Sequence, residues 1–193
     1  QLALIAYLTA YISGNNELLD NMKKVPLVLK ETLDNSKEKI EKCASKLISA
    51  DDAFILARGY LYPIALETAL KIQETCYIKS KGYAISDFYH GPLAQIDEKT
   101  PVVVLAGKGK AFNDASNMID KLQSLKNEPT IITNDKELSD KIENSILIPD
   151  TGYEATSVFP FTIFVQSLAE FVSINRGLNP DSPRALNKVT ITK

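Results

Sequence analysis

Four short apolar runs spaced along the chain constrain its fold more than any other feature. Each is followed at once by turn-forming or charged residues, and they occupy residues 54–57, 102–106, 130–133 and 146–148. Runs this short and continuously apolar are typical of strands covered on both faces. The stretches between and after them have helical patterns, at 62–79, 111–125, 136–141 and 155–175.

This alternation predicts an α/β fold: a doubly wound parallel sheet with helices on both sides. In such sheets ligands bind outside the carboxyl ends of the strands. The loops after Ala57, Ala106, Thr133 and Ile148 are therefore the first places to expect a site.

Additional helices are expected before the sheet. Residues 1–13 form an apolar helix, and two charged amphipathic helices follow at 17–33 and 35–48, divided near Pro26 and around Asp34. The apolar opening is too short for a membrane span and lacks a signal peptide's charged start, so no membrane partner is expected. Because this helix begins abruptly at Gln1 without a capping residue, we expect the sequence to be a piece of a longer chain.

Composition excludes several classes of function. The 193 residues carry a formal net charge of −2, which argues against nucleic-acid binding because phosphate neutralisation needs a basic face. Cys43 and Cys76 lie far apart and match reduced, buried thiols of a cytoplasmic protein. With only one histidine beside them, no metal site is expected.

Three charged residues stand out on the helix expected at 62–79. Glu67, Lys71 and Glu74 fall within roughly 60° of arc on one helix face. They could be an ordinary ladder of helix-surface salt bridges, or a carboxylate in a cleft that carries protons while the lysine tunes its charge. Spacing alone leaves both interpretations open.

Three other features are candidates from their chemistry. His90, the only histidine, lies in SDFYHGPLAQ, where it is either a proton carrier or a hydrogen-bonded structural residue. Lys188 lies in a C-terminal tail that is either frayed or an arm able to form a Schiff base. Residues 107–110, GKGK, follow a strand and open a helix; an exposed turn is favoured over a phosphate site because the Walker spacing is missing.

Two long stretches resemble a known family. They are ARGYLYPIALETALKIQETCYIKSKGYAISDFYHGPLAQID and RGLNPDSPRALNKVTITK. They resemble the second sugar-isomerase (SIS) domain of the isomerase half of glutamine–fructose-6-phosphate aminotransferases and of stand-alone phosphosugar isomerases and amino-sugar-phosphate deaminases. The resemblance covers nearly all of 50–193. It implies a flavodoxin-like three-layer αβα sandwich, a sugar-phosphate substrate, no cofactor, a homodimer or higher homo-oligomer, and a cytoplasmic location.

The resemblance also implies roles for the helix face. Glu74 fills the position of the carboxylate that moves a proton between C1 and C2 of the sugar, with Lys71 and Glu67 in supporting positions. Arg58 and Gly59, at the start of the first stretch, are carried over as substrate-binding residues. The implied reaction is aldose–ketose interconversion of a hexose or amino-hexose 6-phosphate.

Two more roles come from the resemblance. His90 fills the position of the histidine that assists ring opening, which in relatives reaches into a neighbouring subunit's site. Lys188 fills the position of the tail lysine that engages the open-chain keto sugar.

The chain departs from the family pattern in ways that define its expected organisation. The Ser/Thr-rich loop that grips the sugar phosphate belongs to a first SIS domain, and no such loop is visible. We therefore expect residues 1–16 to end a preceding SIS domain, 17–50 to connect, and 51–193 to form the second SIS domain with its tail. Asp87-Phe88-Tyr89 replaces the Glu-Leu-Lys typical of the aminotransferases, which favours the stand-alone enzymes.

Three functions are consequently weighed. The first is a phosphosugar isomerase or isomerising deaminase, with the isomerase domain of an aminotransferase as its variant. The second is a non-catalytic sugar-phosphate-binding regulator. The third is a scaffold whose SIS domain serves for dimerisation.

Overall fold

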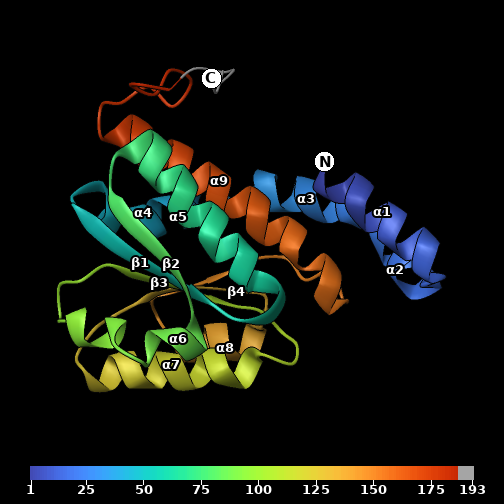
Figure 1. Cartoon of the computed structure of the whole chain (residues 1–193), viewed down its shortest axis with the longest axis horizontal. Coiled ribbons are helices and arrows are strands. Elements are labelled where there is room, and N and C mark those ends of the chain that lie inside the picture. Colours follow the sequence, from blue (N-terminus) through green and yellow to red (C-terminus); the bar gives the residue numbers. More distant parts are fainter. Residues whose placement is uncertain (187–193) are drawn as a thin grey trace, which may run out of the picture.

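The structure is a computed structural model and describes residues 1–186. Within that part lies a five-stranded parallel sheet of strand order β2-β1-β3-β4-β5 (Figure 1). The strands are β1 Asp52–Ala57, β2 Lys79–Ala84, β3 Val102–Ala106, β4 Thr130–Thr133 and β5 Ser145–Leu147. The fold class predicted from the apolar runs is confirmed.

Helices precede the sheet and connect its strands. The α-helices are α1 Leu2–Ser13, α2 Asn16–Met22, α3 Val25–Asp34, α4 Lys37–Ile48, α5 Tyr62–Cys76, α6 Ile85–Phe88, α7 Phe112–Ser124, α8 Lys136–Lys141 and α9 Val158–Asn175. Short 3-10 helices are η1 Gly59–Leu61, η2 Pro92–Gln95 and η3 Glu154–Thr156.

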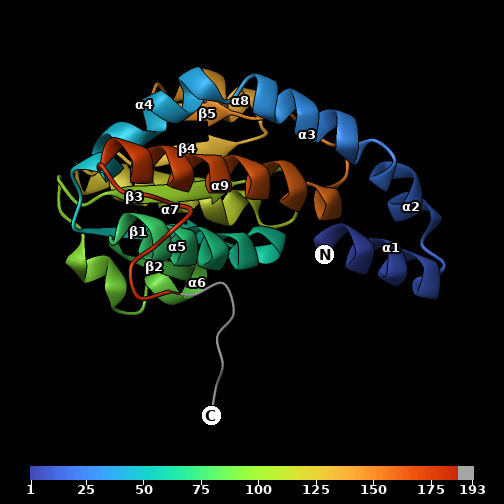
Figure 2. The same ribbon diagram turned by 90° about the horizontal axis from the view of Figure 1, so that it is seen from above.

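The sheet is the middle of three layers, with α4, α5 and α9 on one face and α6, α7 and α8 on the other (Figures 1 and 2). Strand residues alternate between these faces, as the pleat requires. In β1, Ala53 and Ile55 contact the α5 side, whereas Phe54 and Leu56 contact the α7 side. Because both faces are covered, strand residues on either side of the pleat have apolar partners, which explains the continuous apolar runs.

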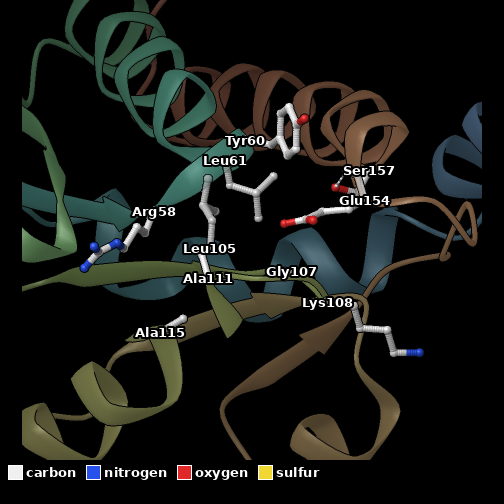
Figure 3. A pocket seen from close by; sticks show the side chains of 10 residues that line it. All are labelled: Arg58, Tyr60, Leu61, Leu105, Gly107, Lys108, Ala111, Ala115, Glu154 and Ser157. Carbon is white, nitrogen blue, oxygen red and sulfur yellow. Dashed lines mark hydrogen bonds between the residues drawn. The ribbon is translucent and has the colours of Figure 1, made fainter. Parts of the chain in front are cut away.

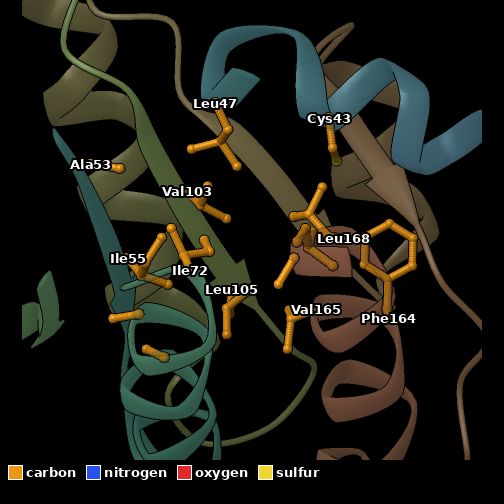
Figure 4. Packing of buried hydrophobic residues seen from close by; sticks show 14 of the residues in the cluster. Cys43, Leu47, Ala53, Ile55, Ile72, Val103, Leu105, Phe164, Val165 and Leu168 are labelled. Carbon is orange, nitrogen blue, oxygen red and sulfur yellow. The ribbon is translucent and has the colours of Figure 1, made fainter. Parts of the chain in front are cut away.

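The larger core lies between the sheet and helices α4, α5 and α9. Figure 4 shows Leu47 of α4, Ile72 of α5 and Leu168 of α9 pointing toward Ile55 and Val103 of the sheet. In the described part of the chain, the segment Glu154–Asn175 is long and apolar enough to cross a membrane. Half of the residues of α9 are buried, and the apolar ones among them pack mainly in this core.

The prediction of four strands was incomplete, since β2 is a fifth. Its sequence, KSKGYA, has no continuous apolar run because β2 is an edge strand, where Lys79 and Lys81 are exposed. Gly82 is needed there, since a Cβ atom would lie 2.9 Å from the carbonyl oxygen of Ala65 in α5. The helix expected at 62–79 therefore ends earlier, at Cys76.

The N-terminal helices form a small separate cluster. The helix predicted at 17–33 is two helices, α2 and α3, because Pro26 favours a new first turn. Met22 and Val25 pack against Phe159 of α9. Helix α1 contacts mainly α2 and leaves many large apolar side chains exposed, namely Leu2, Leu4, Ile5, Tyr7, Leu8, Tyr11 and Ile12.

Candidate active site

Helix α5 presents the charged face predicted from the sequence. Its apolar residues pack against the sheet and α9, and they include Ile64, Ala65, Ala69 and Ile72. This packing fixes the rotation of α5 and leaves Glu67, Lys71 and Glu74 partly exposed on another side.

Lys71 and Glu74 form an ion pair, with 2.7 Å between Lys71 Nζ and Glu74 Oε2. The hydrogen bond to Glu74 raises the pKa of Lys71 above its ordinary value; partial burial opposes this, and the charges of Glu67 and Glu74 add to it. Each side chain of the pair is about one third exposed, 34% and 32%. Such a pair contributes about 0–1 kcal/mol to stability, so its geometry matters more for chemistry than for folding.

Glu67 is held separately from this pair. Its Oε1 accepts a hydrogen bond from Nε2 of Gln166 on α9, at 3.3 Å. Of the salt-bridge ladder considered for this face, the structure therefore contains one ion pair, between Lys71 and Glu74. Sequence reasoning did not single out Gln166 as a partner, because no spacing rule relates α5 to α9.

Glu74 lines an open groove between α5 and the C-terminal tail. The groove has a volume of about 390 Å³, and its lining residues are Leu70, Gln73, Glu74, Tyr77, Arg184, Ala185 and Leu186. A carboxylate that lines a groove beside an ammonium group can meet a small polar ligand and exchange protons with it. Lys188, the tail candidate, lies outside the described residues.

His90 lies far from Glu74 within the described chain. Helix α5 ends shortly before β2 begins, so Glu74 is near the amino edge of the sheet. His90 follows α6, beyond the carboxyl end of β2, and is exposed. Its backbone N–H donates a hydrogen bond to the Asp87 carbonyl oxygen at 3.1 Å. Since a strand of this length spans about 20 Å, the two residues do not meet within one copy of the chain.

Arg58 and Gly59 lie at the carboxyl end of β1, where the strand order reverses. Arg58 pairs with Asp114 of α7, with 3.4 Å between Nε and Oδ2. Open α/β sheets usually bind ligands at this reversal. Here only about 10 Å³ of space remains, between Arg58, Leu61 and residues 107–108 (Figure 3). That is room for about one water molecule, so no sugar fits there.

The carboxylate of Glu154 closes this place. Figure 3 shows it directed toward the loop at Gly107, with the Lys108 ammonium pointing elsewhere. Glu154 Oε1 accepts a hydrogen bond from the backbone N–H of Lys110 at 3.0 Å. A Cβ atom at Gly109 would lie 2.2 Å from that carboxyl group. The GKGK loop thus holds a carboxylate of its own chain, in keeping with the expectation that it is not a phosphate site.

Of the strand-end loops expected to carry a site, the one after β1 has little room for a ligand. The loop after β1 is closed by Glu154, whereas the charged face and its groove lie along α5 and the tail. The charged pair belongs to the crossover helix, and its position near the amino edge follows from the direction of α5.

The strand order and this helix face first define a class: a flavodoxin-like α/β domain whose crossover helix presents charged side chains. A family model described as SIS domain matches residues 46–169. The chain belongs to the SIS domain family.

Three relatives illustrate the similarity. Glutamine–fructose-6-phosphate aminotransferase (isomerizing) of Aquifex aeolicus is 35% identical over 192 residues, which is 98% of this chain and 32% of the relative. The C-terminal domain of glucosamine-fructose-6-phosphate aminotransferase from Francisella tularensis is 25% identical, with a TM-score of 0.75 over 84% of this chain and 46% of that chain. Glucosamine-6-phosphate deaminase from Thermotoga maritima has a TM-score of 0.68 over 96% of this chain and 53% of that chain at 20% identity, which shows the fold alone.

The chain spans about a third of the length of the Aquifex relative. The aminotransferases to which the sequence pointed occur among these relatives, and the deaminase shares the fold.

Proposed function

We propose that this chain carries the isomerase chemistry of a phosphosugar enzyme, the aldose–ketose interconversion of a hexose or amino-hexose 6-phosphate. The observation that carries the proposal is the Lys71–Glu74 pair on the open side of α5, bordering a groove large enough for a small ligand. Its support from relatives is that an aminotransferase described as isomerizing matches nearly the whole chain.

In this proposal Glu74 is the proton carrier. Aldose–ketose interconversion removes a proton from one carbon and returns it to the adjacent one, so one base must reach both positions. The ammonium group of Lys71, 2.7 Å from Glu74 Oε2, holds the Glu74 side chain in place beside the groove. Glu67, held by Gln166, remains a proposed substrate-binding residue. The small space beside Arg58 does not support that role for Arg58 and Gly59.

The proposal requires a second copy of the chain for ring opening. Glu74 and His90 lie at opposite ends of strand β2, so a His90 that acts beside Glu74 has to come from a neighbouring copy. We therefore propose a homo-oligomer in which His90 of one copy serves as the acid at the sugar ring of the next. Lys188 of the tail is proposed to engage the open-chain sugar.

The proposed organisation keeps 51–193 as the second SIS domain, 17–50 as a connection and 1–16 as the end of a preceding unit. The exposed apolar side chains of α1, such as Leu4 at 74% and Ile12 at 76%, support this division because such a surface is usually covered.

The test measures exchange of substrate protons with solvent, catalysed by the full-length protein. We expect Glu74→Gln to lower deuterium incorporation at C1 or C2 of fructose 6-phosphate or glucosamine 6-phosphate by about 10²–10⁴-fold, without changing the fold. The matched control is Glu128→Gln, because Glu128 also pairs with a lysine, Lys46, at 3.5 Å on a different surface.

The outcomes separate the competing functions. Exchange lost only in Glu74→Gln supports the isomerase. Fructose 6-phosphate binding without exchange in the unsubstituted protein would replace it with a regulatory sugar-phosphate binder. Ammonia release from glucosamine 6-phosphate distinguishes a deaminase from an isomerase.

A further inference from the structure

The C-terminal tail is attached to α5 at one aromatic residue. Tyr77 directly follows α5 and adopts a left-handed backbone conformation with φ of 58°. The Arg184 guanidinium carbon lies 4.1 Å from the centre of the Tyr77 ring. In addition, the backbone N–H of Arg184 donates a hydrogen bond to Tyr77 Oη at 2.8 Å. One side chain thus holds Arg184 through both its ring and its hydroxyl group.

The backbone of Tyr77 directs its ring toward the tail. A left-handed residue ends a helix and turns the chain sharply. Glycine is the usual residue at such a position, because other side chains adopt it at a cost in strain. That a tyrosine stands there indicates that its ring has a local use, and the contacts described above identify Arg184 as its partner.

The attachment borders the groove that contains Glu74. Tyr77 and residues 184–186 line the groove on one side, and Glu74 and Leu70 line it from α5. Figures 1 and 2 show the tail passing the C-terminal end of α5. Fixing Arg184 therefore holds residues 184–186 beside the groove that Glu74 lines.

We propose that Tyr77 and Arg184 form a clasp whose role is to position the C-terminal tail against the Glu74 groove. Both are positioning residues, and this inference rests on the proposed function of Glu74. Without the clasp, residues 184–186 would leave the groove, and the reaction at Glu74 would lose the wall that they form.

The first measurement detects the clasp without any catalysis. Trypsin cleaves after Arg184, and the Lys99–Thr100 bond in an exposed loop of the same chain serves as an internal reference. Tyr77→Asn removes the ring but keeps a residue that tolerates the left-handed conformation. We expect cleavage after Arg184 to become at least about tenfold faster relative to Lys99, as the local contact is lost. Tyr77→Phe, which keeps the ring, should show a smaller increase.

The second measurement links the clasp to the reaction. In the intact protein, Tyr77→Asn should lower kcat for proton exchange more than it raises KM, and Arg184→Lys, which keeps a cation over the ring, should recover part of the rate. Lys79→Gln, which removes a cation of the adjacent edge strand, should leave both rates unchanged.

Unchanged cleavage after Arg184 in Tyr77→Asn would overturn the clasp. Faster cleavage with an unchanged exchange rate would overturn its role in positioning. If the unsubstituted protein shows no exchange, the proposed function fails instead, and the cleavage rates alone decide whether the clasp exists.

Discussion

Single side chains decide which parts of this fold are open to a ligand. Glu154 places its carboxylate on the backbone N–H of Lys110 and leaves about 10 Å³ at the reversal of strand order. On α5, by contrast, Glu74 borders a groove of about 390 Å³. The fold's usual ligand position is thus closed by a residue of the chain itself, and the accessible charged groups lie on the crossover helix.

The burial of one thiol, that of Cys43, predicts how the stability of the protein depends on pH. Burial raises the pKa of the Cys43 thiol to about 12, from 9.0. In the unfolded chain this thiol ionises above about pH 9, whereas the folded protein keeps the proton. The contribution to stability is therefore unchanged below pH 9 and falls as pH rises toward 12, by at most about 1.4 kcal/mol per pH unit.

Urea unfolding of the wild-type protein and Cys43→Ala at pH 8, 9 and 10 measures this effect. We expect the free energy of unfolding to fall more steeply between pH 9 and 10 in the wild type than in the variant. Equal slopes for the two proteins would contradict the burial of this thiol.

At the scale of elements, the sequence predicted those whose pattern is set locally. Helix α8 lies at the predicted residues 136–141, because Asp135 caps its first turn by accepting from the N–H of Leu138 at 2.8 Å. The four strands buried on both faces were likewise visible as apolar runs. In contrast, β2 depends on pairing with β1 and on contact with α5, so its charged sequence gave no local signal.

Some residues of the candidate site could also be predicted from local sequence, and others could not. Glu67, Lys71 and Glu74 could be predicted to share a face because helix geometry relates them. Gln166 and Arg184 could not, since their contacts with α5 residues join parts of the chain that are far apart in sequence. His90 was identifiable as a candidate, but its distance from Glu74 follows from the directions of α5 and β2.

The contact between the C-terminal end of α9 and the end of α4 leads to a prediction about stability. Arg176, just after α9, donates from Nη1 to the carbonyl oxygens of Ile48 at 2.7 Å and Ala50 at 2.9 Å, near the end of α4. Arg176→Met leaves these partly buried carbonyl groups without a donor, which should lower the free energy of unfolding by about 1–3 kcal/mol. Urea unfolding measures the loss.

Arg58→Met is the matched control, because Arg58 makes an exposed ion pair with Asp114. We expect it to cost less than about 1 kcal/mol. A loss for Arg176→Met no larger than for this control would show that the link between α9 and α4 contributes little.

At the scale of the whole molecule, the described chain has surfaces that its own residues leave uncovered. Helix α1 exposes Tyr11 at 80% and Ile12 at 76%. The face of α5 that carries Glu74 also exposes Leu66 and Leu70. These uncovered surfaces agree with the proposal that a complete site needs residues from outside this copy of the chain.

The central claim is that Glu74 of one copy and His90 of another act in one site. Its most direct test is to mix two variants of the intact protein, Glu74→Gln and His90→Ala, each with its own exchange activity largely lost. In a two-fold symmetric dimer with random exchange of subunits, about a quarter of the sites regain both groups. We predict that the mixture, after subunit exchange, recovers about a quarter of the wild-type rate; a mixture that stays as inactive as its two components would contradict the shared site.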